Sequence, residues 1–487
     1  MKYSYIITLL LLNYIKGDNN SSTLTINANM RSETIIVIDS QMHIDYGLSY
    51  PITYELTIPP GSYDLSSYRK FQYNQEWSQI LEKTSDDFFN GIEAVRFDYQ
   101  NNIAFVSIGF SDISDSIFIK ITDNESNIIE STYSQMSQYY DNRDAVVTST
   151  ADDWGAWSNP YFVQTCEIFR SFNLWISPAI ITDFLDSNSW SSIQNQLDLG
   201  YVEPVAHSRT HPHTPYENIE SEVLGCKQDL IQNLNMPIYN RYGSNEYIYA
   251  WIAPYGEYSV EIDTAVSDAK YLISRLFYEN QHGFSNWDQS LMKFEPVGAS
   301  IELGGYYYWT GSTDTIELNH TFDDILTYGG IYHLMSHPAI IDWENDVYPW
   351  VHLEHISNRK NIWYVGFGHL YTYHFIQSAY PSINLKSENE NAPVPQIVKL
   401  HQNYPNPFNP KTIISYQLED IAYVNLDIVD LLGQRTRTLT SGYQNSGQST
   451  IEWDATDDFG KIVPGGIYFY RLSIGSVVIT KKMLLLK

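Results

Sequence analysis

The sequence predicts a multidomain protein in which an α/β barrel stands between two β-rich segments. Strand-like and helix-like stretches alternate between residues 143 and 385, whereas β patterning dominates 18–142 and 398–487. A chain of 487 residues is long enough to form several domains with substantial cores. We therefore expect three folded parts, which we take in chain order.

Residues 1–17 have the character of a secretory signal peptide. Lys2 supplies a short basic region, and Ile6 to Leu12 form an apolar stretch. This stretch is too short to span a bilayer, and no other segment resembles a membrane span. We therefore expect export of the chain and no membrane span in the mature protein.

The segment 18–142 is expected to be a β-rich accessory domain. Turn signals such as Pro59-Pro60-Gly61 separate its apolar runs, and Trp77–Lys83 is expected to be a short helix. The predicted strands are 32–40, 52–58, 93–99, 103–110 and 117–122. The domain could bind glycan or cap its neighbour, and the lack of recognisable site residues favours capping.

Between residues 143 and 385, apolar strand-like runs alternate with helical stripes. The predicted strands are 145–149, 174–181, 202–206, 247–252, 272–277 and 331–336, and the predicted helices are 160–172, 191–199, 216–234, 260–269, 322–327 and 363–376. Repeated βα units predict a parallel sheet that is closed, or nearly closed, into a barrel. Chemistry in such barrels lies at the carboxyl ends of the strands.

The last 100 residues begin with a linker. Residues 386–397 contain acidic, asparagine and proline residues, which are typical of linkers. Residues 398–487 return to short strands separated by turns such as Pro464-Gly465-Gly466. Their number and length predict a β-sandwich of immunoglobulin-like size.

The composition excludes some partners. The net charge is 28 − 57 = −29, which repels nucleic-acid phosphates and anionic membranes. Only Cys166 and Cys226 are present, both in predicted helices of the barrel, so a disulfide and two buried thiols remain open alternatives. Trp154, Trp157 and Trp251 lie beside the motifs described next, where they could line a sugar groove or pack inside the core.

Two short motifs are the most informative features of the chain. Thr150-Ala151-Asp152-Asp153 ends the first predicted barrel strand, and His207-Ser208-Arg209-Thr210-His211 follows the third. The two histidines lie one helical turn apart, so their rings can converge on one divalent ion. Adjacent aspartates diverge at a strand end, so one can bind the ion while the other accepts a proton.

These motifs resemble those of the polysaccharide deacetylases, the NodB-homology carbohydrate esterases. The first matches Thr-Phe-Asp-Asp, the second matches His-Ser/Thr-x-x-His, and Leu334-Met335-Ser336-His337 matches the final Leu-x-x-His. The third family motif, Arg-x-Pro-Tyr-Gly, is met only in part by Ile252-Ala253-Pro254-Tyr255-Gly256. The resemblance covers about half of the chain and implies a distorted barrel of seven βα units.

The resemblance also implies a site and a reaction. Asp153, His207 and His211 would hold a divalent metal ion, with zinc expected first. Asp152 would be the general base, His337 the general acid, and the backbone N–H of Tyr255 would face the developing oxyanion. The implied reaction removes acetyl groups, N- or O-linked, from a polysaccharide or oligosaccharide.

The chain departs from the family at the third motif. Ile252 stands where the family has an arginine that orients the base. Arg209 and Arg241 lie close to the motifs in sequence and are candidates to replace it. Six further histidines match no motif and are expected to be structural or exposed: His320, His333, His352, His355, His369 and His374.

The carboxyl-terminal segment resembles the sorting domain of type IX secretion substrates. The residues that carry this resemblance are Tyr404-Pro405-Asn406-Pro407-Phe408-Asn409-Pro410, Leu431-Leu432-Gly433-Gln434, Trp453-Asp454, Gly465 to Leu472 and Lys481-Lys482. The resemblance implies the type IX machinery as a partner and a secreted or cell-surface location.

Three functional hypotheses follow from the sequence. The first is a secreted metal-dependent polysaccharide deacetylase. The second is a non-hydrolytic glycan-binding surface protein that kept the barrel. In this hypothesis efficient chemistry was lost because Ile252 stands in place of the arginine. The third is a carbon–nitrogen hydrolase that acts on a non-sugar amide.

Overall fold

The computed structural model describes residues 24–30, 33–37, 45–71, 76–84, 91–110, 116–278, 282–305, 311–379, 383–385, 398–418, 422–430, 435–458, 460–474 and 477–486. The predicted signal peptide (1–17), the predicted linker (386–397) and Leu431 to Gln434 lie outside the described residues. The chain forms two compact units, Met1–Ser387 and Glu388–Lys487.

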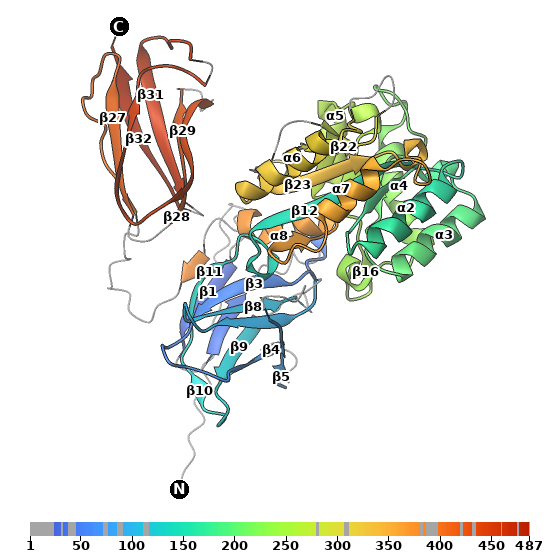
Figure 1. The fold of residues 1–487 in the computed structure, drawn as a ribbon, viewed down its shortest axis with the longest axis horizontal. Coiled ribbons are helices and arrows are strands. Elements are labelled where there is room, and N and C mark those ends of the chain that lie inside the picture. The colour runs from blue at the N-terminus through green and yellow to red at the C-terminus, as the bar shows by residue number, and fades with distance from the viewer. Residues whose placement is uncertain are drawn as a thin grey trace, which may run out of the picture. The chain divides into compact units, whose positions relative to one another are not determined.

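A parallel sheet is the centre of the first unit (Figure 1). Its strands are β12 (Ala145–Trp154), β13 (Ser177–Ile180), β14 (Val205–Ala206), β17 (Ala250–Ile252), β18 (Ile273–Tyr278), β21 (Val297–Ala299), β22 (Ile301–Leu303), β23 (Ile331–Ser336) and β24 (Ile362–Tyr364). They follow the order β21-β18-β17-β14-β13-β12-β23-β22, with β24 beside β12, and every pairing is parallel.

The two ends of this sheet are neighbours in the chain. β21 and β22 are separated only by Ser300, whose N–H donates to the carbonyl of His333 in β23 (2.8 Å). One interrupted strand therefore pairs with β18 on one side and with β23 on the other. The sheet curls back on itself, which agrees with the nearly closed parallel barrel predicted from the βα alternation.

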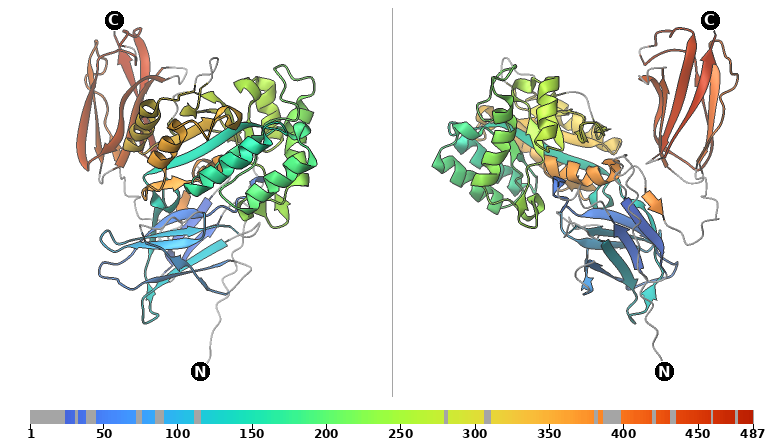
Figure 2. Two further views of the ribbon diagram at one scale, coloured as in Figure 1. Left: turned by 45° about the vertical axis from the view of Figure 1, so that its right-hand side comes forward. Right: turned by 180° about the vertical axis from the view of Figure 1, so that it is seen from behind.

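Among the described residues, the helices α2 to α7 connect successive barrel strands on the outside of the sheet, and α8 follows the last barrel strand, β24 (Figure 2). They are α2 (Asn159–Ser171), α3 (Ser187–Asp198), α4 (Cys226–Asn233), α5 (Val260–Asp268), α6 (Thr315–Thr327), α7 (Tyr348–Ile356) and α8 (Phe367–Ala379). Local signals set their starts: the side chain of Asp186 accepts from the Ser189 N–H at α3, and Ser259 caps α5 in the same way. Cys166 in α2 and Cys226 in α4 are buried and free, which decides between the two predicted states.

Several predicted helices differ from the structure. The predicted helix 322–327 begins earlier, at Thr315 of α6, and the predicted helix 363–376 begins only at Phe367 of α8, because residues 362–364 form β24. The predicted helix 216–234 begins later, as a π-helical turn at Ser221–Gly225 that continues into α4. The side chain of Glu222 accepts from the N–H groups of Arg209 and Thr210, so this turn also holds the histidine loop. The predicted helix at Trp77–Lys83 is wrong, because the chain there forms two short edge strands, β5 (Ser78–Gln79) and β6 (Leu81–Glu82).

The described residues of the amino-terminal part form two mainly antiparallel sheets, which agrees with the predicted β-rich character. One has the order β25-β1-β2-β9-β4-β5 with β10 beside β9, and the other β11-β3-β8-β7-β6. The remaining strands are β1 (Leu24–Met30), β2 (Glu33–Val37), β3 (Ile52–Thr57), β4 (Ser66–Phe71), β7 (Ala94–Asp98), β8 (Ile103–Ile108), β9 (Ser116–Thr122), β10 (Ile128–Ile129), β11 (Thr132–Met136) and β25 (Ile383–Leu385). β25 pairs with β1, so the predicted assignment of 383–385 to the barrel differs from the structure.

These sheets contact the barrel at the amino-terminal ends of its strands. The Tyr249 hydroxyl, just before β17, donates to the Gly47 carbonyl (3.0 Å), and the Tyr139 hydroxyl donates to Gly329, just before β23 (2.8 Å). Buried residues of both parts share one hydrophobic cluster. The site motifs follow the opposite, carboxyl ends of the strands, so these contacts favour the capping role for the amino-terminal part.

A buried carboxyl group lies at this end of the barrel. Glu203 accepts hydrogen bonds from the Gly368 N–H (2.9 Å) and Ser177, and a Cβ atom at Gly366 or Gly368 would lie 2.2 or 2.4 Å from its oxygens. Burial raises the pKa of Glu203 to about 8, well above its ordinary value of 4.5. The neighbouring His369 supplies no positive charge near neutral pH, because burial lowers its pKa to about 3.

Glu203→Gln should therefore stabilise the protein at alkaline pH. The folded state holds the Glu203 proton more tightly than the unfolded state, so stability falls as the pH rises from about 4.5 to about 8. Glutamine keeps the acceptor oxygen without the charge. We expect a gain on the order of 3 kcal/mol at pH 9 and little difference at pH 4 in denaturant titrations. An equal effect at both pH values would contradict the buried-charge explanation.

Two short hairpins complete the first unit: β15 (Arg241–Tyr242) with β16 (Asn245–Glu246), and β19 (Trp287–Asp288) with β20 (Lys293–Phe294). No helix among the described residues has the length and apolar character needed to cross a membrane.

The second unit contains two antiparallel sheets. One has the order β26 (Val398–Leu400), β27 (Thr412–Leu418) and β30 (Gly447–Trp453), and the other β29 (Arg435–Gln444), β28 (Ala422–Val429), β31 (Gly466–Ile474) and β32 (Val477–Leu485). Their buried side chains form one cluster that includes Ile414, Leu426, Trp453 and Tyr470. The β-rich prediction agrees with this, while an immunoglobulin-like topology stays a prediction.

Candidate metal and catalytic site

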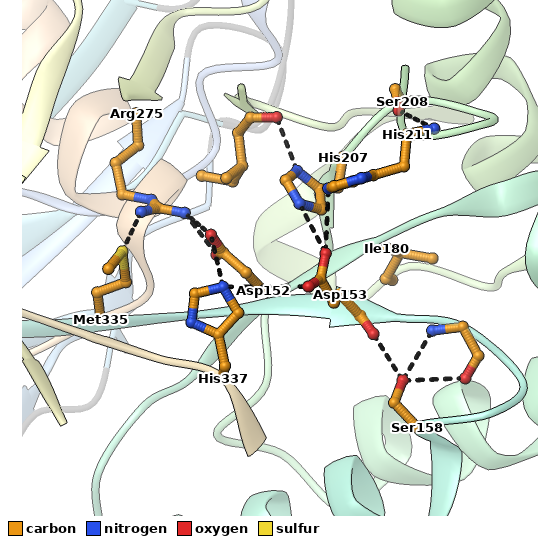
Figure 3. Close-up of polar contacts among 12 residues, drawn as sticks. Asp152, Asp153, Ser158, Ile180, His207, Ser208, His211, Arg275, Met335 and His337 are labelled. Carbon is orange, nitrogen blue, oxygen red and sulfur yellow. Dashed lines mark hydrogen bonds and ion pairs between the residues drawn. The ribbon is translucent and has the colours of Figure 1, made fainter. Parts of the chain in front are cut away.

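The two adjacent aspartates separate at the end of β12. Asp153 has a positive φ of 77°, which turns the chain out of the strand. Its carboxylate faces the histidine loop after β14, whereas the carboxylate of Asp152 faces β18 and is 6% exposed (Figure 3). The predicted division of the pair into two environments is present.

Three side chains converge on one position. The Asp153 Oδ1 atom lies 3.3 Å from Nε2 of His207 and 3.1 Å from Nε2 of His211. The candidate ligand atoms of the three residues all lie within 4.8 Å of one another. One carboxylate and two imidazoles in this arrangement could hold a divalent ion.

The orientation of His207 suits ligation. Its Nδ1 donates to the Ile252 carbonyl (2.9 Å), because a carbonyl oxygen only accepts. In the neutral ring this leaves the lone pair on Nε2, which faces Asp153. Position 252 thus supports the site through its backbone, although its side chain differs from the family motif.

The His211 ring is held by its loop. The His211 N–H donates to the Ser208 hydroxyl (2.9 Å), and both residues have positive φ angles, 54° and 68°. Tyr255 also has a positive φ, 58°, and its ring lies 4.4 Å from the His211 ring between centroids. Asp153, Ser208, His211 and Tyr255 thus concentrate strained backbone at one place, as functional sites often do.

The charge on Asp153 is stabilised by its neighbours. Burial alone would raise the pKa of Asp153, but hydrogen bonds and charge from the His207 and His211 rings, when these are protonated, hold it well below its usual range. A cation at this position, whether on the rings or bound between them, therefore favours the ionised carboxylate.

Arg275 is the arginine that contacts the predicted base. Its Nη2 atom donates to both carboxylate oxygens of Asp152, and the Arg275 side chain is 1% exposed. Arg275 lies on β18 directly beside Ile252 of β17 in the sheet register. Asp152 therefore has an arginine partner on the strand next to position 252.

The two sequence-based candidates for this role are wrong. The guanidinium of Arg209 pairs with Asp229 (2.7 Å) behind the histidine loop. Arg241 pairs with Glu246 (2.9 Å) across its own hairpin. Neither contacts Asp152.

His337 faces both aspartates from β23. Its Nε2 lies 4.0 Å from an oxygen of Asp152 and 4.0 Å from an oxygen of Asp153. Its Nδ1 lies 2.8 Å from Oε1 of Glu302, a β22 residue that is 1% exposed. Burial would lower the pKa of His337, but the Glu302 hydrogen bond and the charges of Asp152, Glu302 and Asp153 outweigh it and raise the pKa.

Sequence reasoning missed Arg275 and Glu302, yet both leave a trace in the sequence. Each is a single charged residue inside an apolar strand-like run, in Ile273-Ser274-Arg275-Leu276 and in Ile301-Glu302-Leu303. A charge at a buried strand position requires a partner. Such positions in a barrel strand therefore indicate residues that pair inside the site.

The tryptophans and remaining histidines divide by burial. Trp154 and Trp251 are 0% exposed and pack in the core, whereas Trp157 is 55% exposed. The Nε2 atom of His333 forms a hydrogen bond with the Thr150 hydroxyl (3.0 Å), and Nε2 of His352 forms one with the Tyr332 hydroxyl (2.7 Å). Both pairs are buried. None of the six histidines outside the motifs belongs to the cluster of possible metal ligands found among the described residues.

Comparison with solved structures gives partial, distant matches. A proposed polysaccharide deacetylase from Mycobacterium smegmatis matches with 11% identity over 52% of this chain and 97% of its own, at a TM-score of 0.38. A family 4 acetyl xylan esterase from Clostridium thermocellum, in complex with cobalt, matches with 13% identity, 47% and 90% coverage and a TM-score of 0.30. A CE4 family pseudoenzyme from Bacillus anthracis matches with 12% identity, 48% and 68% coverage and a TM-score of 0.30. These likenesses carry no inference about activity.

No curated protein matches this chain. Residues 402–486 match the family model described as the secretion system C-terminal sorting domain. The match confirms the sorting domain that the sequence predicted. It indicates that this protein is secreted or attached to the cell surface.

Proposed function

We propose that this protein is an exported metal-dependent hydrolase that removes acetyl groups from a polysaccharide. The observation that carries the proposal is the convergence of Asp153, His207 and His211 beside the Arg275–Asp152 pair and His337. A ligand set, a paired carboxylate and a buried histidine at one barrel end suit hydrolysis of an acyl group.

The donor set fits a divalent ion, and zinc is the ion we propose. Two imidazoles and one carboxylate are common zinc ligands, and three protein ligands leave a position open for substrate. Such an ion supplies polarisation of the acyl carbonyl and a lowered pKa for water.

The protein groups then divide the proton transfers. Asp152, oriented by Arg275, accepts a proton from the attacking water as its oxygen bonds to the acetyl carbon. The Tyr255 N–H stabilises the negative charge that develops on the carbonyl oxygen. His337, oriented by Glu302, donates a proton to the sugar nitrogen or oxygen as its bond to the acetyl carbon breaks. Acetate and a free amine or hydroxyl are the products.

Arg275 also bears on the non-hydrolytic alternative. That hypothesis rested on the loss of an arginine beside the base at position 252. Because Asp152 has an arginine partner from β18, the hydrolytic reading is favoured.

The test is acetate release by the purified full chain with zinc. Substrates should include N-acetylated chitooligosaccharides and O-acetylated xylooligosaccharides, with Asp152→Asn as the inactive control. We expect enzymatically detected acetate from at least one class with the wild type and about 100-fold less with the variant. Equal release by both proteins from every substrate would contradict the proposal.

Glu302→Gln should weaken the acid step. Glutamine keeps the size of Glu302 but removes the charge that supports a protonated His337. We expect kcat for acetate release to fall about 10- to 100-fold with little change in KM. Glu302→Asp should recover part of the loss if charge is the cause, whereas equal defects in both variants would indicate a packing effect.

A further inference from the structure

Two exposed aromatic side chains lie beside the site. Trp157, which follows β12, is 55% exposed, and Phe184, which follows β13, is 44% exposed. Their rings form a T-shaped pair with centroids 5.5 Å apart. Because apolar side chains of this size are usually buried, a paired exposed set marks a candidate binding surface.

The position of Trp157 is set by the metal-ligand loop. A Cβ atom on Gly155 would lie 2.0 Å from the Trp157 ring, so the ring rests against a backbone that has no side chain. The Ser158 hydroxyl donates to the Asp153 carbonyl (2.6 Å) and accepts from the Gly155 N–H (3.0 Å). The indole therefore rests against Gly155, which lies two residues after the metal-ligand candidate Asp153.

The loop that contains Phe184 is hydrogen-bonded to the Asp153 loop and to the histidine loop. The Ala156 N–H donates to the Phe184 carbonyl (2.8 Å), which ties the loop after β13 to the Asp153 loop. The N–H groups of Thr182 and Asp183 donate to the carbonyls of Ser208 (3.3 Å) and Arg209 (3.0 Å) in the histidine loop. The aromatic pair therefore has a fixed place relative to Asp153 and His207, as a pre-formed subsite requires.

We propose that Trp157 and Phe184 form a sugar-binding platform that takes a pyranose ring next to the acetylated residue. The proposal rests on the proposed function and names its substrate as a chain of sugars rather than a single acetylated sugar. A pyranose has apolar C–H faces that pack on flat aromatic rings, while its hydroxyls stay in water. One such contact predicts a several-fold gain in affinity for the longer chain.

The test measures KM for acetate release as the oligosaccharide is lengthened from one to five residues. In the wild type KM should fall as the oligosaccharide becomes longer. In Trp157→Ala the ratio of KM for the shortest to KM for the longest oligosaccharide should be about fivefold to tenfold smaller, with a smaller change in kcat. Phe184→Ala should have a weaker effect in the same direction. Tyr328→Ala is the matched control, because Tyr328 is 77% exposed at the end of α6, just before β23 begins, on the side away from the site. Unchanged length dependence in Trp157→Ala would overturn the platform.

A binding readout separates this proposal from the proposed function. Asp152→Asn protein with zinc should be retarded in native gels that contain glycol chitin or acetylated xylan, and adding Trp157→Ala should weaken the retardation several-fold. Retardation that depends on Trp157 supports the platform even if the wild type releases no acetate. Retardation that Trp157→Ala leaves unchanged, or the absence of retardation by either polymer, overturns the platform even if acetate release is normal.

Discussion

Arg275→Met should abolish most acetate release and weaken the fold. The side chain is 1% exposed, and its removal leaves the Asp152 carboxylate buried without its cationic partner. Breaking one side of a buried ion pair costs about 3–5 kcal/mol. We expect a clear fall in the denaturation midpoint and, at temperatures where the variant is folded, a loss of acetate release of at least about 100-fold because the base is misoriented.

A relocated arginine provides a sharper version of this test. Ile252 and Arg275 are register partners on adjacent strands, so Ile252→Arg combined with Arg275→Ile exchanges the two side chains. Partial recovery of activity relative to Arg275→Met would show that Asp152 needs a guanidinium from either strand. Arg241→Met is the matched control, since Arg241 pairs with Glu246 at a distance from the site, and its activity should stay within about twofold of the wild type. Full activity of Arg275→Met would contradict the assigned role.

The Arg275 case also shows where sequence reasoning reaches its limit. The motifs predicted the residues that converge, because Asp153, His207 and His211 lie within short, ordered patterns at strand ends. Proximity in sequence favours Arg209 and Arg241 as partners of Asp152, but these two arginines pair with Asp229 and Glu246. The position of Arg275 depends on which strands are neighbours and on their register, and neither property is written in local sequence.

Some features of the barrel could likewise be predicted from local sequence, and others could not. Alternation of apolar runs and helical stripes was sufficient to predict parallel βα units. The closing strand was not predicted, because β21 and β22 are only three residues each and Ser300 interrupts them. The pairing of β25 with β1 was missed for a similar reason, since a three-residue strand has too little pattern to reveal its partner.

The role of the amino-terminal part depends on contacts that composition cannot show. The chain contains 40 tyrosines, a residue type that suits both sugar binding and packing. In the structure Tyr139 and Tyr249 use their hydroxyls to bond backbone carbonyls across the contact between these sheets and the barrel, and their rings are buried. The same residue type faces solvent at Tyr255, beside the site. Burial, rather than residue type, separates the two uses.

Asp152 and Asp153 offer a pair of isosteric variants that should fail in different ways. Asp153→Asn removes the charge that faces His207 and His211, so zinc affinity should fall. Asp152→Asn leaves this ligand set intact. It removes the proton acceptor and also the negative charge paired with the buried Arg275, so its Tm without zinc should be lower than that of the wild type. Zinc binding to the folded state raises stability by about 2.7 kcal/mol at a concentration 100 times the Kd, so melting with and without zinc reports occupancy.

We expect zinc to raise the Tm of the wild type and of Asp152→Asn, and to raise that of Asp153→Asn much less at the same concentration. Both variants should lose acetate release by about 100-fold or more, because one lacks the base and the other the ion. His207→Ala should behave like Asp153→Asn. A zinc response lost in Asp152→Asn but kept in Asp153→Asn would reverse the two roles. If zinc raised the Tm of all three variants as it does that of the wild type, the ion would bind elsewhere in the chain. The assignment of the reaction to the site around Asp153 would then be wrong. The comparison of these two variants is therefore the strictest test of the assigned roles. Asp152 and Asp153 are adjacent in sequence and equal in charge and size, and they differ in the side chains that each one faces.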